Sequence, residues 1–199
     1  MADLKRDLHG ALIATRSAVL SRLNGLSEYD LRRPMTATGT NLLGLVKHLA
    51  GLEYSYLGTT FGRPAPENLP WLADDSVWQN ADMWARAEET SASIVDLYER
   101  ACAHADLTIS GLSLDAPGSV PHWTDGERDT TLGAMLVWMV WETAQHAGHA
   151  DIVRELIDGT AGADHDQIFN QAGWHTHVAA IKAAANTFIA GPSSVPDQT

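Results

Sequence analysis

Apolar residues recur at intervals of three or four positions along most of this chain, which is the spacing of an amphipathic α-helix. No segment alternates apolar and polar residues for long enough to predict a strand. The pattern predicts helices over residues 3–26, 40–58, 76–104, 131–158 and 167–189. The expected fold class is therefore all-α, a four-helix bundle followed by a C-terminal helix.

The segments between these helices indicate where each helix begins and ends. Residues 27–34 predict a single helical turn that Pro34 terminates, and Gly159 is a stop signal for the fourth long helix. The candidate N-caps of the second, third and fourth helices are Thr38 or Thr40, Ser76, and Thr130 or Thr131. Residues 106–129 form a long connection rich in glycine and proline, which suits a crossover between two helices that run in the same direction.

The chain is expected to divide near residue 160. Residues 1–160 contain the four long helices and predict one bundle domain. Residues 161–199 predict a C-terminal helix, broken near Gly173, and a disordered tail over residues 191–199 that contains two serines and two prolines. This second segment is expected to pack on the bundle or to extend from it.

Composition and charge narrow the classes of partner. The formal net charge of −12 argues against nucleic-acid phosphates and against an anionic membrane surface. The sequence shows no signal peptide and no apolar run long enough to span a bilayer, so a soluble cytoplasmic protein is expected. The single cysteine, Cys102, excludes an internal disulfide, fits a reducing compartment, and is expected to be a buried apolar residue.

The fourth long helix carries polar groups on the face that should be buried. Glu142, His146 and His149 lie on the same stripe as the apolar residues Met135 and Val153. Residues three or four positions apart on a helix have Cβ atoms about 5–6 Å apart, so these side chains can converge. Because an unpaired buried polar group costs on the order of 1–3 kcal/mol, a ligand such as a divalent metal is expected to satisfy them.

A second histidine, His48, lies on the core-facing stripe of the helix over residues 40–58. His48, Glu142 and His146 together make a set of two nitrogen donors and one oxygen donor on two facing helices. Three protein ligands leave a position for water or substrate, as in catalytic zinc sites. Nickel, ferrous iron and manganese remain open. His149 is interpreted as a fourth ligand, as a donor that orients a ligand, or as a catalytic base.

Simpler interpretations apply to each residue taken alone. A single histidine on an apolar face is more often a hydrogen-bonded core residue than a ligand, and Glu142 with His146 has the spacing of a surface ion pair. Their occurrence together on two inward stripes favours the metal site. His122 and Trp123, in the connection before the fourth helix, are candidates to line a pocket.

Two motifs resemble the DinB superfamily, and more narrowly its actinobacterial branch related to mycothiol-dependent enzymes. They are Thr38-Gly-Thr-Asn-Leu-Leu-Gly-Leu-Val-Lys-His48 and Glu142-Thr-Ala-Gln-His146-Ala-Gly-His149. The resemblance covers about residues 1–158. It implies an up-down-down-up bundle that holds a divalent metal with one residue of the second helix and two of the fourth.

The second motif departs from the pattern of many members, which have a histidine where this chain has Glu142. The ligand set His, Glu, His of mycothiol-dependent maleylpyruvate isomerase is more similar, and it implies the ligands His48, Glu142 and His146. Many members have Arg-Gly-Gln after the last ligand, whereas this chain has Ala-Gly-His149. Members of the superfamily are often dimers, so a homodimer is expected.

Two functional hypotheses follow. The first is a metal-dependent S-transferase or isomerase that activates a low-molecular-weight thiol, mycothiol by resemblance, for attack on a small electrophile, with hydrolysis by metal-activated water as a variant. Zinc is the expected metal and His149 the expected catalytic residue. The second is a non-enzymatic bundle, stabilised by a metal or without one, that acts as a dimer or partner-binding module.

Overall fold

The computed structural model describes residues 3–161 and 168–189. The chain forms two compact units, Met1–Gly159 and Thr160–Thr199. The described residues are mostly helical, which confirms the all-α fold class. Among the described helices, none combines the length and the apolar character that crossing a bilayer requires.

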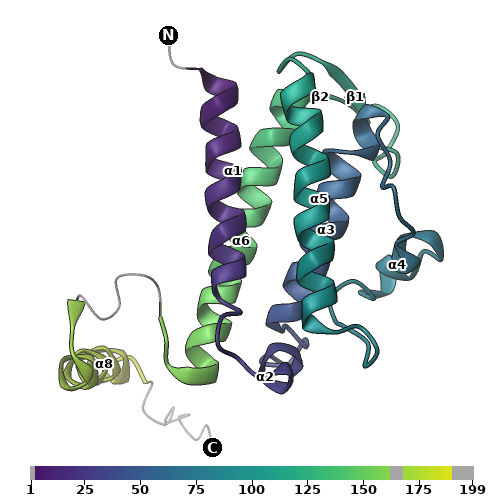
Figure 1. The fold of residues 1–199 in the computed structure, drawn as a ribbon. Coiled ribbons are helices and arrows are strands. Elements are labelled where there is room, and N and C mark those ends of the chain that lie inside the picture. Colours follow the sequence, from purple (N-terminus) through teal and green to yellow (C-terminus); the bar gives the residue numbers. More distant parts are fainter. Residues whose placement is uncertain (1–2, 162–167, 190–199) are drawn as a thin grey trace, which may run out of the picture. The chain divides into compact units, whose positions relative to one another are not determined.

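Four long helices make up the first unit (Figure 1): α1 (Leu4–Ser21), α3 (Leu42–Tyr56), α5 (Ser91–Gly111) and α6 (Leu132–Asp158). A short helix, α2 (Glu28–Arg32), occupies the segment for which a single helical turn was predicted. Asn41, rather than Thr38 or Thr40, caps α3, since its side chain accepts a hydrogen bond from the Gly44 amide. Helix α6 begins after the predicted cap Thr131 and ends at Gly159, whose φ of 78° only glycine adopts at low cost.

The long helices follow the up-down-down-up path that the resemblance implied. At one end of the bundle, Arg154 of α6 donates a hydrogen bond to the carbonyl of Arg22, just after α1, so α1 and α6 are parallel. At the other end, Lys5 of α1 donates to the carbonyl of Leu112, just after α5, so these two helices are antiparallel. Helices α3 and α5 run in the same direction (Figure 1).

The long crossover lies between α3 and α5, and the prediction that it occupies residues 106–129 is wrong. The true crossover, residues 57–90, contains the 3₁₀ turns η1 (Thr59–Phe61) and η2 (Ser76–Gln79) and the short helix α4 (Pro70–Ala73). The predicted helix start at Ser76 is also wrong, because α5 begins after its cap Thr90. Apolar crossover residues such as Val77 and Met83 pack against the core. Their spacing in the sequence therefore resembles that of a helix although the segment is irregular.

The segment 106–129 instead contains the end of α5 and most of a small antiparallel sheet. Strands β1 (Pro117–Ser119) and β2 (Asp129–Thr131) pair with Pro117 opposite Thr131. Strands of three residues are too short to show a period of two, so the sequence pattern did not predict them. The sheet connects the antiparallel helices α5 and α6 directly.

Helix α3 is the centre of the bundle. Its leucines at 42, 43, 45 and 49 are at most 1% exposed, and it contributes to both hydrophobic clusters of the first unit. Helices α5 and α6 both contact it. Any polar side chain on α3 that points inward therefore needs partners from neighbouring elements.

The second unit contains α8 (Gln171–Asn186), which begins after its cap Asn170. The segment predicted as a fifth helix is interrupted at residues 169 and 170, close to the predicted break near Gly173, and α8 itself continues through Gly173. None of the residues of α8 is buried. The predicted disordered tail, residues 191–199, lies outside the described residues.

Candidate metal centre

Helices α3 and α6 bring three predicted metal ligands together. His48 projects from α3, and Glu142 and His146 project from adjacent turns of α6. The Oε1 atom of Glu142 lies 3.7 Å from Nε2 of His48 and 3.1 Å from Nε2 of His146. One donor atom from each residue lies within 4.8 Å of the other two. The side chains are 13–19% exposed, so the site lies near the bundle surface and remains accessible.

These separations fit a small divalent cation. Two ligands that are each about 2.1 Å from a zinc ion in tetrahedral geometry lie roughly 3.4 Å apart. The two measured donor separations, 3.7 and 3.1 Å, lie on either side of this value. The donor set of two imidazoles and one carboxylate suits zinc and other first-row divalent ions. The residues present therefore fit the metal that the resemblance implied.

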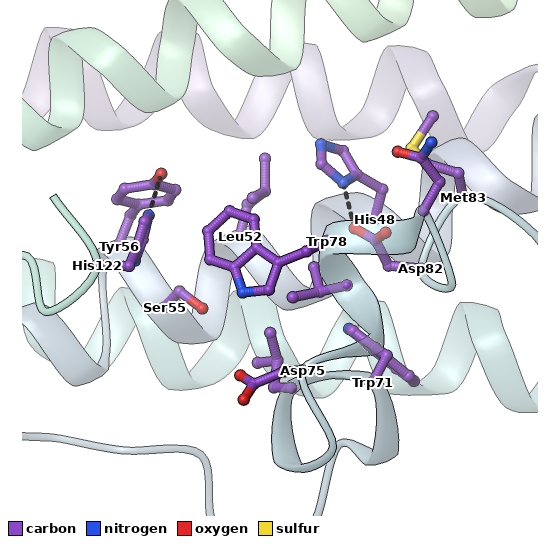
Figure 2. Close-up of a pocket in the computed structure, with 14 residues that line it drawn as sticks. His48, Leu52, Ser55, Tyr56, Trp71, Asp75, Trp78, Asp82, Met83 and His122 are labelled. Atoms are coloured by element: carbon purple, nitrogen blue, oxygen red, sulfur yellow. Dashed lines mark hydrogen bonds and ion pairs between the residues drawn. The ribbon is translucent and has the colours of Figure 1, made fainter.

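The orientation of His48 is fixed by Asp82, a residue of the crossover that the sequence analysis did not identify. The Oδ2 atom of Asp82 lies 2.6 Å from Nδ1 of His48 (Figure 2), and Asp82 is only 4% exposed. A proton on Nδ1 shared with Asp82 leaves the lone pair of Nε2 directed toward Glu142. Carboxylates commonly orient metal-binding histidines in this way.

The beginning of α3 positions this aspartate. Asn41 Nδ2 donates a hydrogen bond to the carbonyl oxygen of Met83 at 3.1 Å. Gly44 allows the same carbonyl to approach the helix, because a Cβ atom at residue 44 would lie only 1.8 Å from it. Asp82 directly precedes Met83. The Asn-Leu-Leu-Gly sequence at the start of α3 therefore places the crossover against the helix and Asp82 against His48.

His149 lies one turn beyond His146 and outside the group of three donors. Its Nδ1 is 3.5 Å from Nδ1 of His146, on the side of that ring away from Glu142, and His149 is exposed. Burial lowers the pKa of His146, and the neighbouring His48 and His149 lower it further, whereas Glu142 acts in the opposite direction. The resulting neutral imidazole is the form that binds a metal.

A cavity of about 480 Å³ opens beside His48 and Asp82 (Figure 2). Its walls include Trp71 and Trp78 from the crossover and His122 from the segment between β1 and β2. His122 therefore lines a pocket, as its position before α6 predicted. The ring nitrogen Nε2 of His122 lies 2.9 Å from the hydroxyl of Tyr56, and burial lowers the pKa of His122. The cavity has the size of a site for a small organic molecule.

The bundle also contains a second buried polar cluster that the sequence analysis missed. Arg16 of α1 donates from Nε and Nη2 to the two carboxylate oxygens of Glu53 on α3, both at 2.7 Å. Its Nη1 donates to Asp106 of α5 at 2.7 Å, and Asp106 also contacts His9. Burial alone would lower the pKa of Arg16, but the charge of Glu53 and the hydrogen bonds to Glu53 and Asp106 together outweigh it and hold the pKa above its ordinary value. The guanidinium group stays charged.

Cys102 does not contribute an activated thiol. It is half-buried against the core, and burial raises the pKa of its thiol well above the ordinary value. A thiol in this environment is a poor nucleophile at neutral pH.

The first unit matches a known family. Residues 7–159 match the family model described as mycothiol-S-transferase. A conserved protein of Enterococcus faecalis with a solved crystal structure has a similar fold, with a TM-score of 0.59 and 13% sequence identity over 80% of this chain and 100% of that chain. Among curated proteins, no relative matches. The chain belongs to the mycothiol-S-transferase family, within the DinB-like superfamily.

Proposed function

We propose that this protein is a divalent-metal-dependent S-transferase that joins mycothiol to a small electrophile. The observation that carries the proposal is the convergence of His48, Glu142 and His146 beside an apolar cavity. The family supports mycothiol as the thiol. The bond formed is between the thiol sulfur and an electrophilic carbon, the leaving group departs with the electron pair of the broken bond, and the thiol proton is released.

Zinc is the proposed metal, held by His48, Glu142 and His146. When bound, it would supply the lowering of the thiol pKa that makes a thiolate available at neutral pH. The chain itself contributes the remaining functions. Asp82 holds His48 in one orientation, and the aromatic walls of the cavity give the electrophile an apolar surface to bind. His149 is proposed to orient His146 and to pass the released proton to solvent.

Two features favour a catalytic site over a structural one. The group of convergent donors among the described residues contains three members and leaves a coordination position for a substrate. His149, the candidate for a fourth ligand, instead contacts the opposite ring nitrogen of His146. The second feature is the cavity that His48 lines, which provides room for a second reactant directly beside the three donors.

The first test is metal analysis of protein purified without a nickel column. Wild-type protein is expected to contain close to one zinc ion per chain, and His146→Ala is expected to contain almost none. His177→Ala, in the second unit, is the matched control and should retain the metal. Equal metal contents in wild type and His146→Ala would exclude the proposed ligand set.

The second test is a transfer assay with 1-chloro-2,4-dinitrobenzene and either mycothiol or glutathione. We expect metal-dependent product formation that is faster with mycothiol. Equal rates at the uncatalysed level with both thiols would contradict the proposal. Loss of the electrophile without any thiol present would assign the hydrolytic variant instead.

A further inference from the structure

The cavity beside the proposed metal centre contains no lysine or arginine among the residues that line it. Its full charges come from the carboxylates of Asp75 and Asp82. Lys47 lies 4.6 Å from the ring centre of Trp71, but its ammonium group is paired with Glu89 at 3.0 Å and does not line the cavity. The cavity therefore offers no cation of its own to an anionic ligand.

A bound divalent cation would not make the net charge around the cavity positive. Its two positive charges would face the carboxylates of Glu142 and Asp82, which lie within the same cluster. A thiolate would then add one negative charge, and Asp75 adds another at the cavity wall. The chain as a whole carries a formal charge of −12, which also repels anions.

Trp71 provides an unused hydrogen-bond donor. The residue is 3% exposed, and its Nε1 atom is buried without a hydrogen-bond partner among the described residues. Its ring packs onto α3 at Gly51, where a Cβ atom would lie 3.3 Å from Nε1. Buried indole N–H groups usually have a partner. Nε1 is covered in this structure, so an acceptor on a ligand would supply one when the ring shifts toward the cavity that it lines.

Trp78 provides an exposed aromatic surface on the same cavity (Figure 2). It is 69% exposed, and the centre of its ring lies 5.9 Å from the centre of the His122 ring. The short turn η2 that carries it is bounded by Asp75 and Asn80, whose φ angles are 59° and 60°. Aspartate and asparagine tolerate this left-handed conformation better than most residues. The turn can therefore hold Trp78 at the cavity without strain at either end.

We propose that this cavity selects an uncharged, flat, apolar electrophile that carries a hydrogen-bond acceptor, and that it rejects anionic electrophiles. The acceptor meets Nε1 of Trp71, and the aromatic or conjugated part of the molecule stacks on Trp78. The inference rests on the proposed function for the identity of the reaction. It can be tested separately because binding of unreactive analogues requires no thiol.

The main experiment is calorimetric titration of the full-length, zinc-loaded protein with two unreactive probes. These are 1,3-dinitrobenzene, which is neutral, and 3-nitrobenzenesulfonate, which is anionic and a weak metal ligand. The neutral probe is expected to bind at least about tenfold more tightly. Equal affinities, or tighter binding of the sulfonate, would overturn the inference.

Two variants test whether the missing cation is the cause. Ser55→Lys introduces a cation at the cavity wall and should raise the affinity for the sulfonate about tenfold. Ala103→Lys adds the same charge at an exposed position of α5 outside the cavity and should leave the affinity ratio unchanged. Asp75→Asn keeps a residue that tolerates the left-handed conformation and should raise sulfonate affinity about threefold. An unchanged ratio in both cavity variants would overturn the charge argument.

Two further variants test the aromatic contacts. Trp71→Phe should weaken binding of 1,3-dinitrobenzene about fivefold more than binding of 1,3-dimethylbenzene, which has no acceptor. Trp78→Ala should weaken both by roughly two- to tenfold, the usual range for an aromatic pair. Equal losses for the two probes in Trp71→Phe would exclude the donor role. Selective probe binding without thiol transfer would count against the proposed function alone.

Discussion

Two clusters of charged and polar groups in the bundle, one buried and one near the surface, differ in whether they are complete. In the first cluster, Arg16 satisfies both carboxylate oxygens of Glu53 and also binds Asp106. In the second, His48, Glu142 and His146 direct donor atoms toward a common point, and Oε1 of Glu142 lies 3.1 Å from Nε2 of His146 and 3.7 Å from Nε2 of His48. The first cluster is closed by the protein itself, whereas the second is open and would be completed by the cation of the proposed function.

The difference separates a cluster that pairs its own charges from the proposed metal centre, even though each cluster includes a residue of α3. His48 and Glu53 are five residues apart on α3, which places them about 140° apart around the helix axis. Glu53 faces an arginine on α1, and its side chain is fully buried. His48 faces a carboxylate and an open cavity. The identity of the facing residue, rather than burial alone, decides the role.

The largest expected effect comes from opening the closed cluster. Arg16→Leu leaves the Glu53 carboxylate buried without its partner and should reduce the free energy of unfolding by about 3–5 kcal/mol. Urea unfolding measures this loss. The double variant Arg16→Leu, Glu53→Leu should recover most of it, because two apolar residues need no pairing. A single variant as stable as wild type would show that the cluster is not structural.

Neutralising the carboxylate of Glu142 in the open cluster should instead leave the stability of the metal-free protein nearly unchanged and prevent metal binding. Glu142→Gln should change the stability of the metal-free protein by less than about 1 kcal/mol, because nothing buried is left unpaired. It should abolish the rise in melting temperature on adding zinc, which for wild type at 100 times the dissociation constant corresponds to about 2.7 kcal/mol. Glu155→Gln, exposed on the same helix, is the control and should retain the rise.

A smaller change tests the support of His48. Asp82→Asn should weaken zinc binding by about 10–100-fold, or roughly 1.4–2.7 kcal/mol, because His48 loses its orienting carboxylate. Competition with a fluorescent zinc chelator measures the affinity. Asp125→Asn, at a side chain that is 94% exposed, is the control. Wild-type affinity in Asp82→Asn would mean that Asp82 does not position the ligand.

The smallest effect is expected at a third cluster, where the buried Tyr54 meets the partly exposed Glu67. Tyr54 donates to Glu67 at 2.8 Å, and burial together with this hydrogen bond raises the pKa of Tyr54 to about 12. The neutral phenol is favoured in the folded protein, so its contribution is complete below pH 10 and is lost as the pH rises through 12.

Thermal unfolding between pH 9 and 11.5 tests this contribution. Tyr54→Phe should lose less stability over this range than wild type, and the difference should be about 1 kcal/mol or less. Tyr29→Phe, at a tyrosine that is 73% exposed, should behave like wild type. A steeper alkaline loss in Tyr54→Phe would show that the sign of the effect is wrong.

The sequence predicted what depends on local pattern. Helix α6 was predicted almost to the residue, because Thr131 and Gly159 are strong boundary signals. The three donors could be identified because helical spacing puts them on inward stripes. Asp82 could not be identified in this way, because its partner is 34 residues away and no periodic pattern marks a crossover. Arg16 and Glu53 look like surface charges until the two helices are placed side by side.

The close approach of Met83 to Gly44 has a consequence for how the metal centre can vary. A side chain at residue 44 would separate two backbones rather than displace a flexible group. The separation would move Asp82 away from His48, although the proposed ligands His48, Glu142 and His146 would all still be present. Zinc affinity is therefore expected to depend on Gly44 as much as on a ligand. A family member could keep all three ligand residues and still lose its metal through a larger residue at this position.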